Sequence, residues 1–372
     1  MPEIILKNIT KKWGKFVGVK DMSMVIENRA FITLLGPSGC GKTTTLRMIA
    51  GLETPTEGQI IIDNQVVFDS EKGINIGASK RSVGFIFQNY ALWPHMTVRQ
   101  NISFGLEQLK WNKEQIKERV DELLEMLKIE QFDKRYPSEL SGGQQQRVAI
   151  ARTLAPKPKV LFMDEPLSNL DAKLRQEMRT ELKRLHADTN STFVYVTHDQ
   201  LEAMALATKV CLLDEGVVQQ FDPPLVIYDK PKNLFVADFV GNPTMNFINC
   251  KAKKGTEANL LELEFLGFKA HFTANDMVDL RHRDVILGVR PEHMPIRKNG
   301  KIHATAYSTL PSGMETTVKV MYKKELLTSV VFGSIDYAID QDIDIDIISN
   351  NLILFDKETT ERIAIGKIDI YN

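Results

Sequence analysis

Two glycine-rich turns in this sequence have the residue types that hold phosphate groups. The first is GPSGCGKT, Gly36 to Thr43, which follows the apolar run AFITLLG and precedes the helical pattern TTTLRMIAGL. Glycine lets successive backbone N–H groups point at phosphate oxygens, and the N-terminus of the next helix adds partial positive charge. A turn of this spacing between a buried strand and a helix is a P-loop, which holds the phosphates of a nucleotide.

The residue types within this P-loop predict separate roles in binding ATP. Lys42 is expected to reach the β- and γ-phosphates and to assist catalysis, and Thr43 to offer its hydroxyl to Mg²⁺. The other predicted nucleotide contacts in the loop are Gly36, Pro37, Ser38, Gly39, Cys40, Gly41 and Thr44.

A pair of adjacent carboxylates ends the apolar run VLFMDEP. Asp164, at the predicted strand end, is placed to hold Mg²⁺, as the matching carboxylate does in other P-loop enzymes. Glu165 is the candidate catalytic residue that polarises an attacking water. The alternative interpretation is that both carboxylates belong to a solvated strand end.

The second glycine-rich turn is LSGGQQQR, Leu140 to Arg147. Ser141 can cap a helix that begins near Gln144, and Gly142 and Gly143 leave its backbone donors uncovered, so these four residues predict a second phosphate site. A helix inside the same fold could hardly reach the nucleotide at Lys42. The sequence therefore predicts a twofold dimer in which each ATP lies between one chain's P-loop and the other chain's Ser141.

Strand and helix patterns alternate over about the first 240 residues. Apolar runs predict strands at 3–9, 18–26 and 30–36 and in KVLFMDEP and TFVYVTHD, whereas apolar spacing predicts helices at 112–132 and after Asp171. His186, on the second of these helices, is expected on a solvated face. This alternation predicts an α/β fold, a P-loop cassette with a largely parallel sheet core.

The composition changes near DFVGNPTMNFI, and strand patterns dominate beyond it. LLELEFLGF, DVILGVRP, ETTVKVMY, LLTSVVFG and IDIDIISNNLILFD are short runs with Gly or Asn between them. They predict a small OB-like β-barrel. We therefore expect a nucleotide-binding domain over 1–240 and a β-barrel domain over 241–372.

The bulk composition excludes several classes of protein. Forty-seven Lys and Arg against 48 Asp and Glu give a formal charge of −1, so no basic field points to nucleic acid. Three cysteines at unrelated spacings suit a reducing compartment. The N-terminus lacks a signal-peptide pattern, and no run reaches the roughly 18 apolar residues needed to cross a bilayer. Any role at a membrane is expected from the aqueous side.

The sequence resembles the ATP-binding cassette family, whose signature is LSGGQ. The resemblance implies that Gln88 in IFQNY senses Mg²⁺ and the membrane partner and that His198 in VTHD contacts the γ-phosphate. It also implies that Ser168 and Asp171 in SNLD cross the dimer interface and that Trp13 stacks on adenine. The alternative for Trp13 is an ordinary core tryptophan.

Further motifs make the sequence similar to the carbohydrate importers of maltose type. GVRPEHM and VGNPTMNFI resemble markers of the β-barrel (TOBE-like) domain appended to importer ATPases, and NYALWPHMTV and EPLSNLDAKLR fit the same group. Beyond Pro295 the motifs become weaker, which puts regulation by a partner protein there in doubt.

The resemblance implies an ATPase that powers solute import from the cytoplasmic side of the membrane. It would act as a homodimer, or paired with a homologous ATPase, and would bind two polytopic membrane subunits through the 88–140 region. A helical subdomain is expected at about 89–140, with exposed Tyr90, Leu92 and Trp93 as the socket. An external solute-binding protein would take part indirectly.

Other interpretations of the sequence are weaker. A regulatory ATPase that uses its β-barrel as a binding module shares the ATP site and stays open, whereas the C-terminal domain disfavours an efflux ATPase. HRD at 282–284 lacks the asparagine of a kinase loop, and DIDIDI lacks the turn glycine of a calcium loop.

Overall fold

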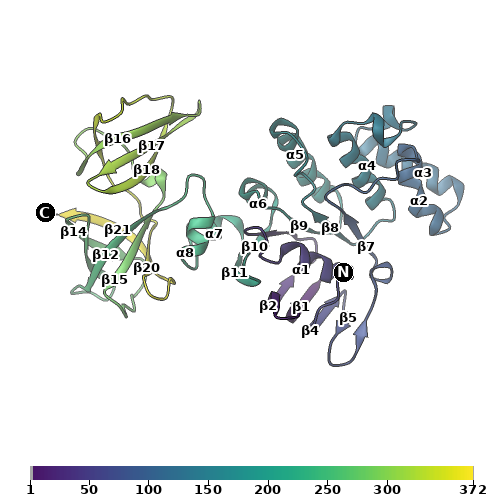
Figure 1. The fold of residues 1–372 in the computed structure, drawn as a ribbon, viewed down its shortest axis with the longest axis horizontal. Helices are drawn as coiled ribbons and strands as arrows, with labels where there is room; N and C mark the ends of the chain where they lie inside the picture. Colours follow the sequence, from purple (N-terminus) through teal and green to yellow (C-terminus); the bar gives the residue numbers. More distant parts are fainter. Residues whose placement is uncertain (1–2, 372) are drawn as a thin grey trace. The chain divides into compact units, whose positions relative to one another are not determined.

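The computed structural model describes residues 3–371, so the terminal residues Met1, Pro2 and Asn372 of the two expected domains lie outside it. The chain forms two compact units, Met1–Pro224 and Leu225–Asn372. The first unit contains two sheets and most of the helices, and the second is built mainly of strands (Figure 1). Within the described residues, no helix has both the length and the apolar composition needed to cross a membrane.

A mostly parallel six-stranded sheet forms the centre of the first unit, in the order β11-β10-β3-β9-β8-β7. Its strands are β3 (Phe31–Leu35), β7 (Val83–Ile86), β8 (Val160–Asp164), β9 (Thr192–Val196), β10 (Lys209–Asp214) and β11 (Val217–Asp222). Every residue of β3, β8 and β9 is buried, as their continuous apolar runs predict. Because these three strands are parallel, the segments that follow them meet at one edge of the sheet.

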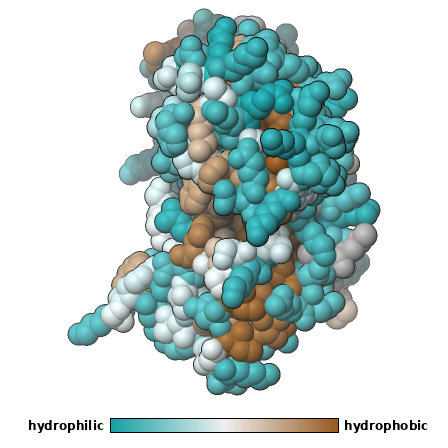
Figure 2. Space-filling view, turned by 90° about the vertical axis from the view of Figure 1, so that its right-hand side faces the viewer, coloured by the Kyte–Doolittle hydropathy of each residue, from teal (hydrophilic) through white to brown (hydrophobic). Residues whose placement is uncertain are grey.

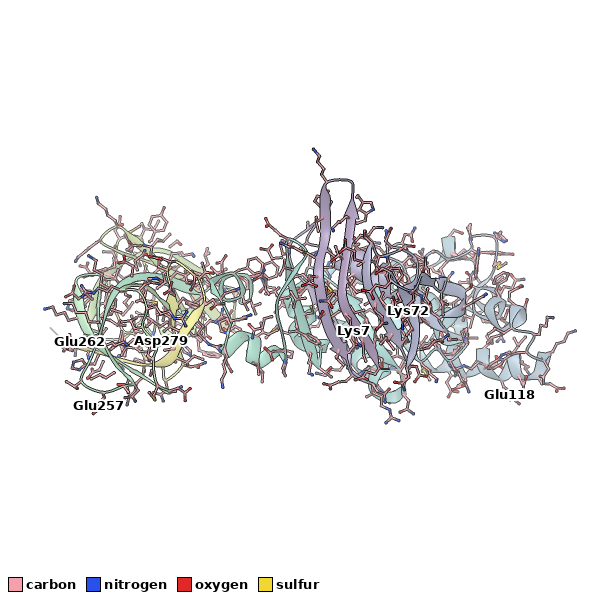
Figure 3. The ribbon with its side chains drawn as sticks, turned by 90° about the horizontal axis from the view of Figure 1, so that it is seen from below. Lys7, Lys72, Glu118, Glu257, Glu262 and Asp279 are labelled. Carbon is pink, nitrogen blue, oxygen red and sulfur yellow. The ribbon has the colours of Figure 1, made fainter. Side chains whose placement is uncertain are left out.

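A second, antiparallel sheet was not predicted separately. It has the order β2-β1-β4-β5-β6 and consists of β1 (Ile4–Trp13), β2 (Phe16–Ile26), β4 (Glu57–Ile62), β5 (Gln65–Asp69) and β6 (Ile74–Asn75). Figure 3 shows the β1–β2 hairpin, which carries the labelled Lys7, standing out beyond the neighbouring strands. One face of this sheet is covered, which explains the alternating burial along β2.

The helices of the first unit form two cores with the parallel sheet. Helix α1 (Lys42–Ala50) packs between the two sheets, since its Leu46, Met48 and Ile49 share a cluster with residues of both. The opposite face is covered by α2 (Val98–Gln108), α3 (Lys113–Met126), α4 (Gly142–Leu154) and α5 (Ala172–Asp188), while α6 (Gln200–Leu206) packs against β3 and α5. Alternate residues of β8 enter alternate cores, so both faces of the sheet are sealed.

Two expectations for these helices were wrong. The helix predicted over 112–132 ends at Met126, because Lys128 adopts a left-handed φ of 56° and only a short 3-10 turn follows. His186 is half-buried and not fully on a solvated face. Its Nε2 lies 3.0 Å from the carbonyl oxygen of Arg29, and its ring meets Phe31 and Phe193 edge-on.

The second unit opens with two short helices and closes a β-barrel. The helices are α7 (Pro224–Asp229) and α8 (Leu234–Phe239). The barrel has the order β12-β13-β14-β21-β20-β15, formed by β12 (Asn246–Lys254), β13 (Leu260–Phe265), β14 (Phe268–Ala274), β15 (Asp284–Val289), β20 (Leu352–Asp356) and β21 (Arg362–Tyr371). LLELEFLGF is therefore not one strand, because the chain turns at Leu266 and Gly267.

A separate four-stranded sheet accompanies the barrel and was not expected. Its order is β18-β17-β16-β19, from β16 (Ile302–Pro311), β17 (Glu315–Tyr322), β18 (Glu325–Phe332) and β19 (Asp342–Ile345). The buried amide of Asn246 joins it to the barrel, because its Nδ2 donates to the carbonyls of Val289 and Thr328 and its Oδ1 accepts from the Thr328 N–H.

Candidate active site

The P-loop folds tightly between β3 and α1 because its glycines adopt conformations that other residues avoid. Gly36, Gly39 and Gly41 have φ values of 149°, 82° and 100°. A Cβ on Gly36 would lie 2.2 Å from the carbonyl oxygen of Leu213, and one on Gly41 would lie 2.5 Å from that of Gly18. The loop therefore presses against neighbouring backbone, and only glycine fits at these two positions.

Lys42 and Cys40 point to the inner side of this loop. The Nζ of Lys42 donates to the carbonyl oxygens of Gly36 and Pro37 at 2.8 and 2.9 Å. The Cys40 side chain is buried in the core and its Sγ lies 3.8 Å from that Nζ. Burial raises the pKa of the thiol, which is therefore neutral at physiological pH. Pro37, Ser38 and Thr44 remain partly or fully exposed around the loop.

Asp164 and Thr43 come together where β8 ends and α1 begins. The Thr43 hydroxyl donates to Oδ1 of Asp164 at 2.8 Å, and Nη2 of Arg47 lies 3.3 Å from Oδ2. A hydroxyl and a carboxylate are the hard oxygen donors that suit Mg²⁺, so the residues present fit this ion. Arg47 was not foreseen. Among residues 3–371 there is no cluster of three or more His, Cys, Asp or Glu side chains that could hold a metal.

Glu165 is held in an unusual backbone conformation next to Asp164. Its φ is 46°, and its N–H donates to the carbonyl of Val196 on β9 at 3.1 Å. Its Oε2 lies 3.4 Å from Nδ1 of His198 and 3.5 Å from Nε2 of Gln88. Gln88 also lies 3.4 Å from the hydroxyl of Ser168. The fold thus brings two other predicted residues, His198 and Gln88, to one carboxylate oxygen of Glu165.

A cavity of about 220 Å³ lies over the P-loop. Trp13, Ser38, Gly39, Gly41, Lys42, Thr43, Thr44 and Glu165 line it among the predicted residues. Phe16 and Gly18 also line it and were missed by the sequence analysis. The rings of Trp13 and Phe16 stack with their centroids 6.1 Å apart, and Trp13 remains 45% exposed, so it is not a core tryptophan.

The second glycine-rich turn has the predicted helix cap and lies outside this cavity. The Oγ of Ser141 accepts the N–H of Gln144 at 3.4 Å, and the Gln144 side chain accepts the N–H of Ser141 at 2.9 Å. Gly143 packs so closely on Leu174 of α5 that a Cβ would lie 2.7 Å from that side chain. Ser141 to Gln144 do not line the P-loop cavity.

Asp171 begins α5 as its N-cap, since Oδ1 accepts the N–H of Leu174 at 3.0 Å. The side chain is exposed and does not line the P-loop cavity. Its capping bond occupies one carboxylate oxygen in the single chain. Its predicted part in an interface stays a prediction.

The prediction that Tyr90, Leu92 and Trp93 are exposed is wrong for Tyr90 and holds only in part for Leu92 and Trp93. Tyr90 is only 4% exposed and belongs to the helical core, while Leu92 and Trp93 are half-buried. Tyr90 has a left-handed φ of 62° that turns its ring inward, and Arg152 of α4 donates to the carbonyls of Tyr90 and Ala91 at 2.8 and 2.6 Å. Burial raises the pKa of the Tyr90 phenol.

Figure 2 views the side of the first unit on which α2 and α3 lie in Figure 1. Its upper part is mainly hydrophilic, and hydrophobic surface gathers in a band at mid-height and in a larger patch below. The labelled Glu118 of α3 points away from the molecule in Figure 3. Leu92 and Trp93 keep part of their apolar surface accessible, since each is only half-buried.

Comparisons with known proteins match both units. The family described as ABC transporter matches residues 19–168, and the MalK OB fold domain matches residues 241–294. The trehalose/maltose import ATP-binding protein MalK of Thermococcus litoralis is 46% identical over 294 residues, which is 79% of each chain. The spermidine/putrescine import ATP-binding protein PotA of Chromobacterium violaceum is 51% identical over 251 residues, 68% of this chain and 66% of that relative.

A solved structure gives the same fold for the first unit. The ATP-binding cassette MJ0796, a dimer in a post-hydrolysis state bound to ADP and Pi, is 35% identical with a TM-score of 0.52, and the match covers 59% of this chain and 98% of that one. The sequence and structure matches confirm the predicted α/β cassette followed by an OB-type β-barrel.

Proposed function

This chain belongs to the ABC transporter family and is an ATP-hydrolysing subunit of that class, and we propose that it powers the import of a carbohydrate. The observation that carries the ATP-hydrolysing function is the meeting of Thr43 with Asp164 and of Glu165 with His198 at one sheet edge, over the P-loop. The MalK OB fold match and the name of the trehalose/maltose relative favour a sugar cargo, and polyols and glycerol phosphate stay within the proposed class. Because the PotA relative is named for spermidine and putrescine import, a polyamine is the alternative cargo to be tested.

The phosphates of ATP would be held by the P-loop backbone and by Lys42. The Nζ of Lys42 lies inside the loop on two carbonyls, so it can exchange these for phosphate oxygens without leaving its position. Thr43, Asp164 and Gln88 would hold Mg²⁺, which neutralises phosphate charge when bound. Trp13 and Phe16 would offer ring faces to the adenine, a contact worth about 1–3 kcal/mol per base.

Glu165 and His198 would act on the attacking water and the γ-phosphate. Glu165 lies at the rim of the P-loop cavity with Oε2 beside His198 and Gln88. A carboxylate in this position can orient a water and accept its proton, and the imidazole can hydrogen-bond the transferred phosphoryl group. Both roles need the positions of the two side chains to be kept to within a fraction of an ångström.

The turn at Ser141 would complete the site of a second subunit. Its capped helix N-terminus and two glycines suit a phosphate, yet it does not line the P-loop cavity of its own chain. The dimeric state of MJ0796 supports a pair of cassettes. This pair would be arranged head to tail and formed by two copies of this chain or by this chain and a homologous ATPase. Ser168 and Asp171 would lie at the same interface.

The remaining partners follow from the importer role. Residues 88–140, with Leu92 and Trp93, would contact two polytopic membrane subunits from the cytoplasmic side, and an external solute-binding protein would deliver the cargo. Residues 1–240 would act as the nucleotide-binding domain with a helical subdomain at about 89–140, and 241–372 as the β-barrel domain. No nucleic acid is expected, given the formal charge of −1.

Purification of the chain from its native membrane in detergent tests this function. An importer ATPase should co-purify with two polytopic proteins, and its ATP hydrolysis in liposomes should increase with a carbohydrate and its binding protein. If only polyamines stimulate ATP hydrolysis, the imported cargo is a polyamine and not a carbohydrate. Recovery without any membrane subunit would favour a regulatory ATPase that uses the β-barrel as its binding module.

A further inference from the structure

A buried carboxylic acid lies behind the turn that carries His198. Glu202 on α6 is only 3% exposed, and it does not line the P-loop cavity. A carboxyl group removed from water is costly unless its oxygens are paired, and burial raises the pKa of Glu202. A residue type this unfavourable in a core indicates a specific task for its side chain.

One oxygen of Glu202 orders the residues on both sides of His198. Its Oε2 accepts the hydroxyl of Tyr195 on β9 and the hydroxyl of Thr197, each at 2.7 Å. The Thr197 Oγ1 in turn accepts the N–H of Asp199 at 3.0 Å. Thr197 and Asp199 flank His198 in the chain, so the backbone of the histidine is fixed from both sides.

Arg175 of α5 connects the same turn to the loop that precedes α5. Its Nη1 lies 3.6 Å from Oδ2 of Asp199, and its Nε lies 3.9 Å from Oε1 of Glu202, within ion-pair range. Its Nη2 donates to the carbonyl oxygen of Leu170 at 3.0 Å. Leu170 belongs to the SNLD segment, next to Asp171. One oxygen of Glu202 therefore contacts the turn that carries His198, and the other faces Arg175, which contacts the SNLD segment.

The His198 side chain itself is weakly held. It is exposed on the surface of the chain, and its Nδ1 lies 3.4 Å from Oε2 of Glu165, where the charge pair depends on protonation of the ring. Its position must therefore come mainly from the backbone of the turn. We propose that Glu202 is a positioning residue that, through Thr197 and Asp199, holds His198 in reach of Glu165 and the γ-phosphate. This inference rests on the proposed catalytic role of His198.

A double-mutant cycle separates positioning from plain structural support. Glu202→Leu should lower kcat for ATP by about 10- to 100-fold and leave KM within about twofold, because it displaces a catalytic group without touching the nucleotide. Glu202→Gln keeps a carbonyl oxygen for both hydroxyls and should restore most of kcat. The exposed Glu177→Leu is the matched control and should behave like the wild type.

The decisive comparison adds His198→Ala, with residual hydrolysis followed by release of radiolabelled phosphate. If Glu202 acts through His198, Glu202→Leu should cause no further loss in the His198→Ala chain. Equal fold losses in both chains would overturn the inference and leave the proposed function intact. Normal turnover by His198→Ala alone would overturn both the inference and the role assigned to His198. If Glu202→Leu does not fold, Thr197→Val removes the same link and is measured in its place.

Discussion

Glu165 occupies a strained position that the surrounding structure maintains. A glutamate at φ 46° is unfavourable by about 1–2 kcal/mol, and such residues persist where neighbouring contacts fix them. Here the N–H of Glu165 donates to the carbonyl of Val196, and the carbonyl oxygen of Glu165 accepts a hydrogen bond from the Ser168 hydroxyl at 2.9 Å. The strain directs the carboxylate toward His198 and Gln88, where it can serve as the base.

Replacement of Glu165 tests this role directly. Glu165→Gln keeps the size and the backbone contacts but cannot accept a proton, so kcat should fall by about 10³-fold, about 4 kcal/mol of barrier. Binding of ATP, measured by equilibrium dialysis, should remain. Glu118→Gln, on the exposed outer side of α3, is the control and should keep full turnover. Normal hydrolysis by Glu165→Gln would show that another group is the base.

His186 predicts a pH-dependent contribution to stability. Burial lowers its pKa below the ordinary value of about 6.5, although the carbonyl of Arg29 opposes this in part. The folded chain therefore binds this proton more weakly than the unfolded chain. The contribution is fully present above that ordinary pKa and is lost as pH falls through and below it.

Urea unfolding of the wild type and of His186→Gln between pH 7.5 and 5.5 measures this contribution. The wild-type midpoint should fall more steeply toward acid than the midpoint of the variant, which has no titrating group at this position. Other groups titrate equally in both chains, so the difference between the curves isolates His186. Parallel curves would mean that the ring is protonated as easily in the folded chain as in the unfolded one.

At the scale of elements, the helix that carries the P-loop is fixed at its far end by Arg81. The Nη1 of this buried arginine donates to the carbonyls of Met48 and Ile49, the last turn of α1, at 2.8 Å each, and its Nε donates to the carbonyl of Ile76 at 2.7 Å. Burial lowers its pKa to about 10, which leaves it charged at neutral pH. A cation at a helix C-terminus stabilises the helix dipole.

Arg81→Met should therefore destabilise the first unit by about 3 kcal/mol, because it leaves buried carbonyls without a donor. The measurement is the urea midpoint, and weaker ATP binding should accompany the loss since α1 begins at Lys42. Arg184→Met, at a side chain that is 82% exposed, controls for the substitution itself. Equal midpoints for the two variants would argue against the capping role.

The elements that could be predicted are those whose burial is encoded locally. The apolar runs of β3, β8 and β9 and the periodicity of α5 need no knowledge of their neighbours. The division of the strands into two sheets, and the sheet from β16 to β19, depend on pairing between distant segments. The end of α3 was missed for a different reason, because the apolar spacing does not encode the left-handed conformation of Lys128.

Within the candidate site, sequence reasoning found the residues that belong to motifs and missed those that only line the cavity. Phe16 and Gly18 lie on β2 and reach the P-loop through the β1–β2 hairpin. The available signal was a glycine inside a predicted strand, which often marks a close approach. In the structure, a Cβ on Gly18 would lie 2.5 Å from the Trp13 ring. Tyr90 was misplaced because Arg152, which binds its carbonyl oxygen, comes from α4, far along the chain.

At the scale of the molecule, a single chain holds two glycine-rich turns that do not share a cavity. The P-loop and Glu165 line the P-loop cavity, while Ser141 caps α4 beside Leu170 and Leu174. If the Ser141 turn holds a phosphate, as proposed, a second chain must bring that phosphate, because the turn does not line the P-loop cavity of its own chain. A closed twofold pair satisfies both turns at once, with the same surface used twice.

Mixing of two inactive chains tests this arrangement. Ser141→Arg should block one half of each site and Lys42→Ala the other, so each homodimer should be inactive. Random pairing of equal amounts should give one intact site in half of the dimers, and therefore about a quarter of the wild-type rate. Lys42→Ala mixed with Asp164→Asn is the matched control, because both changes lie in the P-loop half and no pairing restores a site. If the Ser141→Arg and Lys42→Ala mixture stays as inactive as this control, each chain must hydrolyse ATP without the signature turn of a partner.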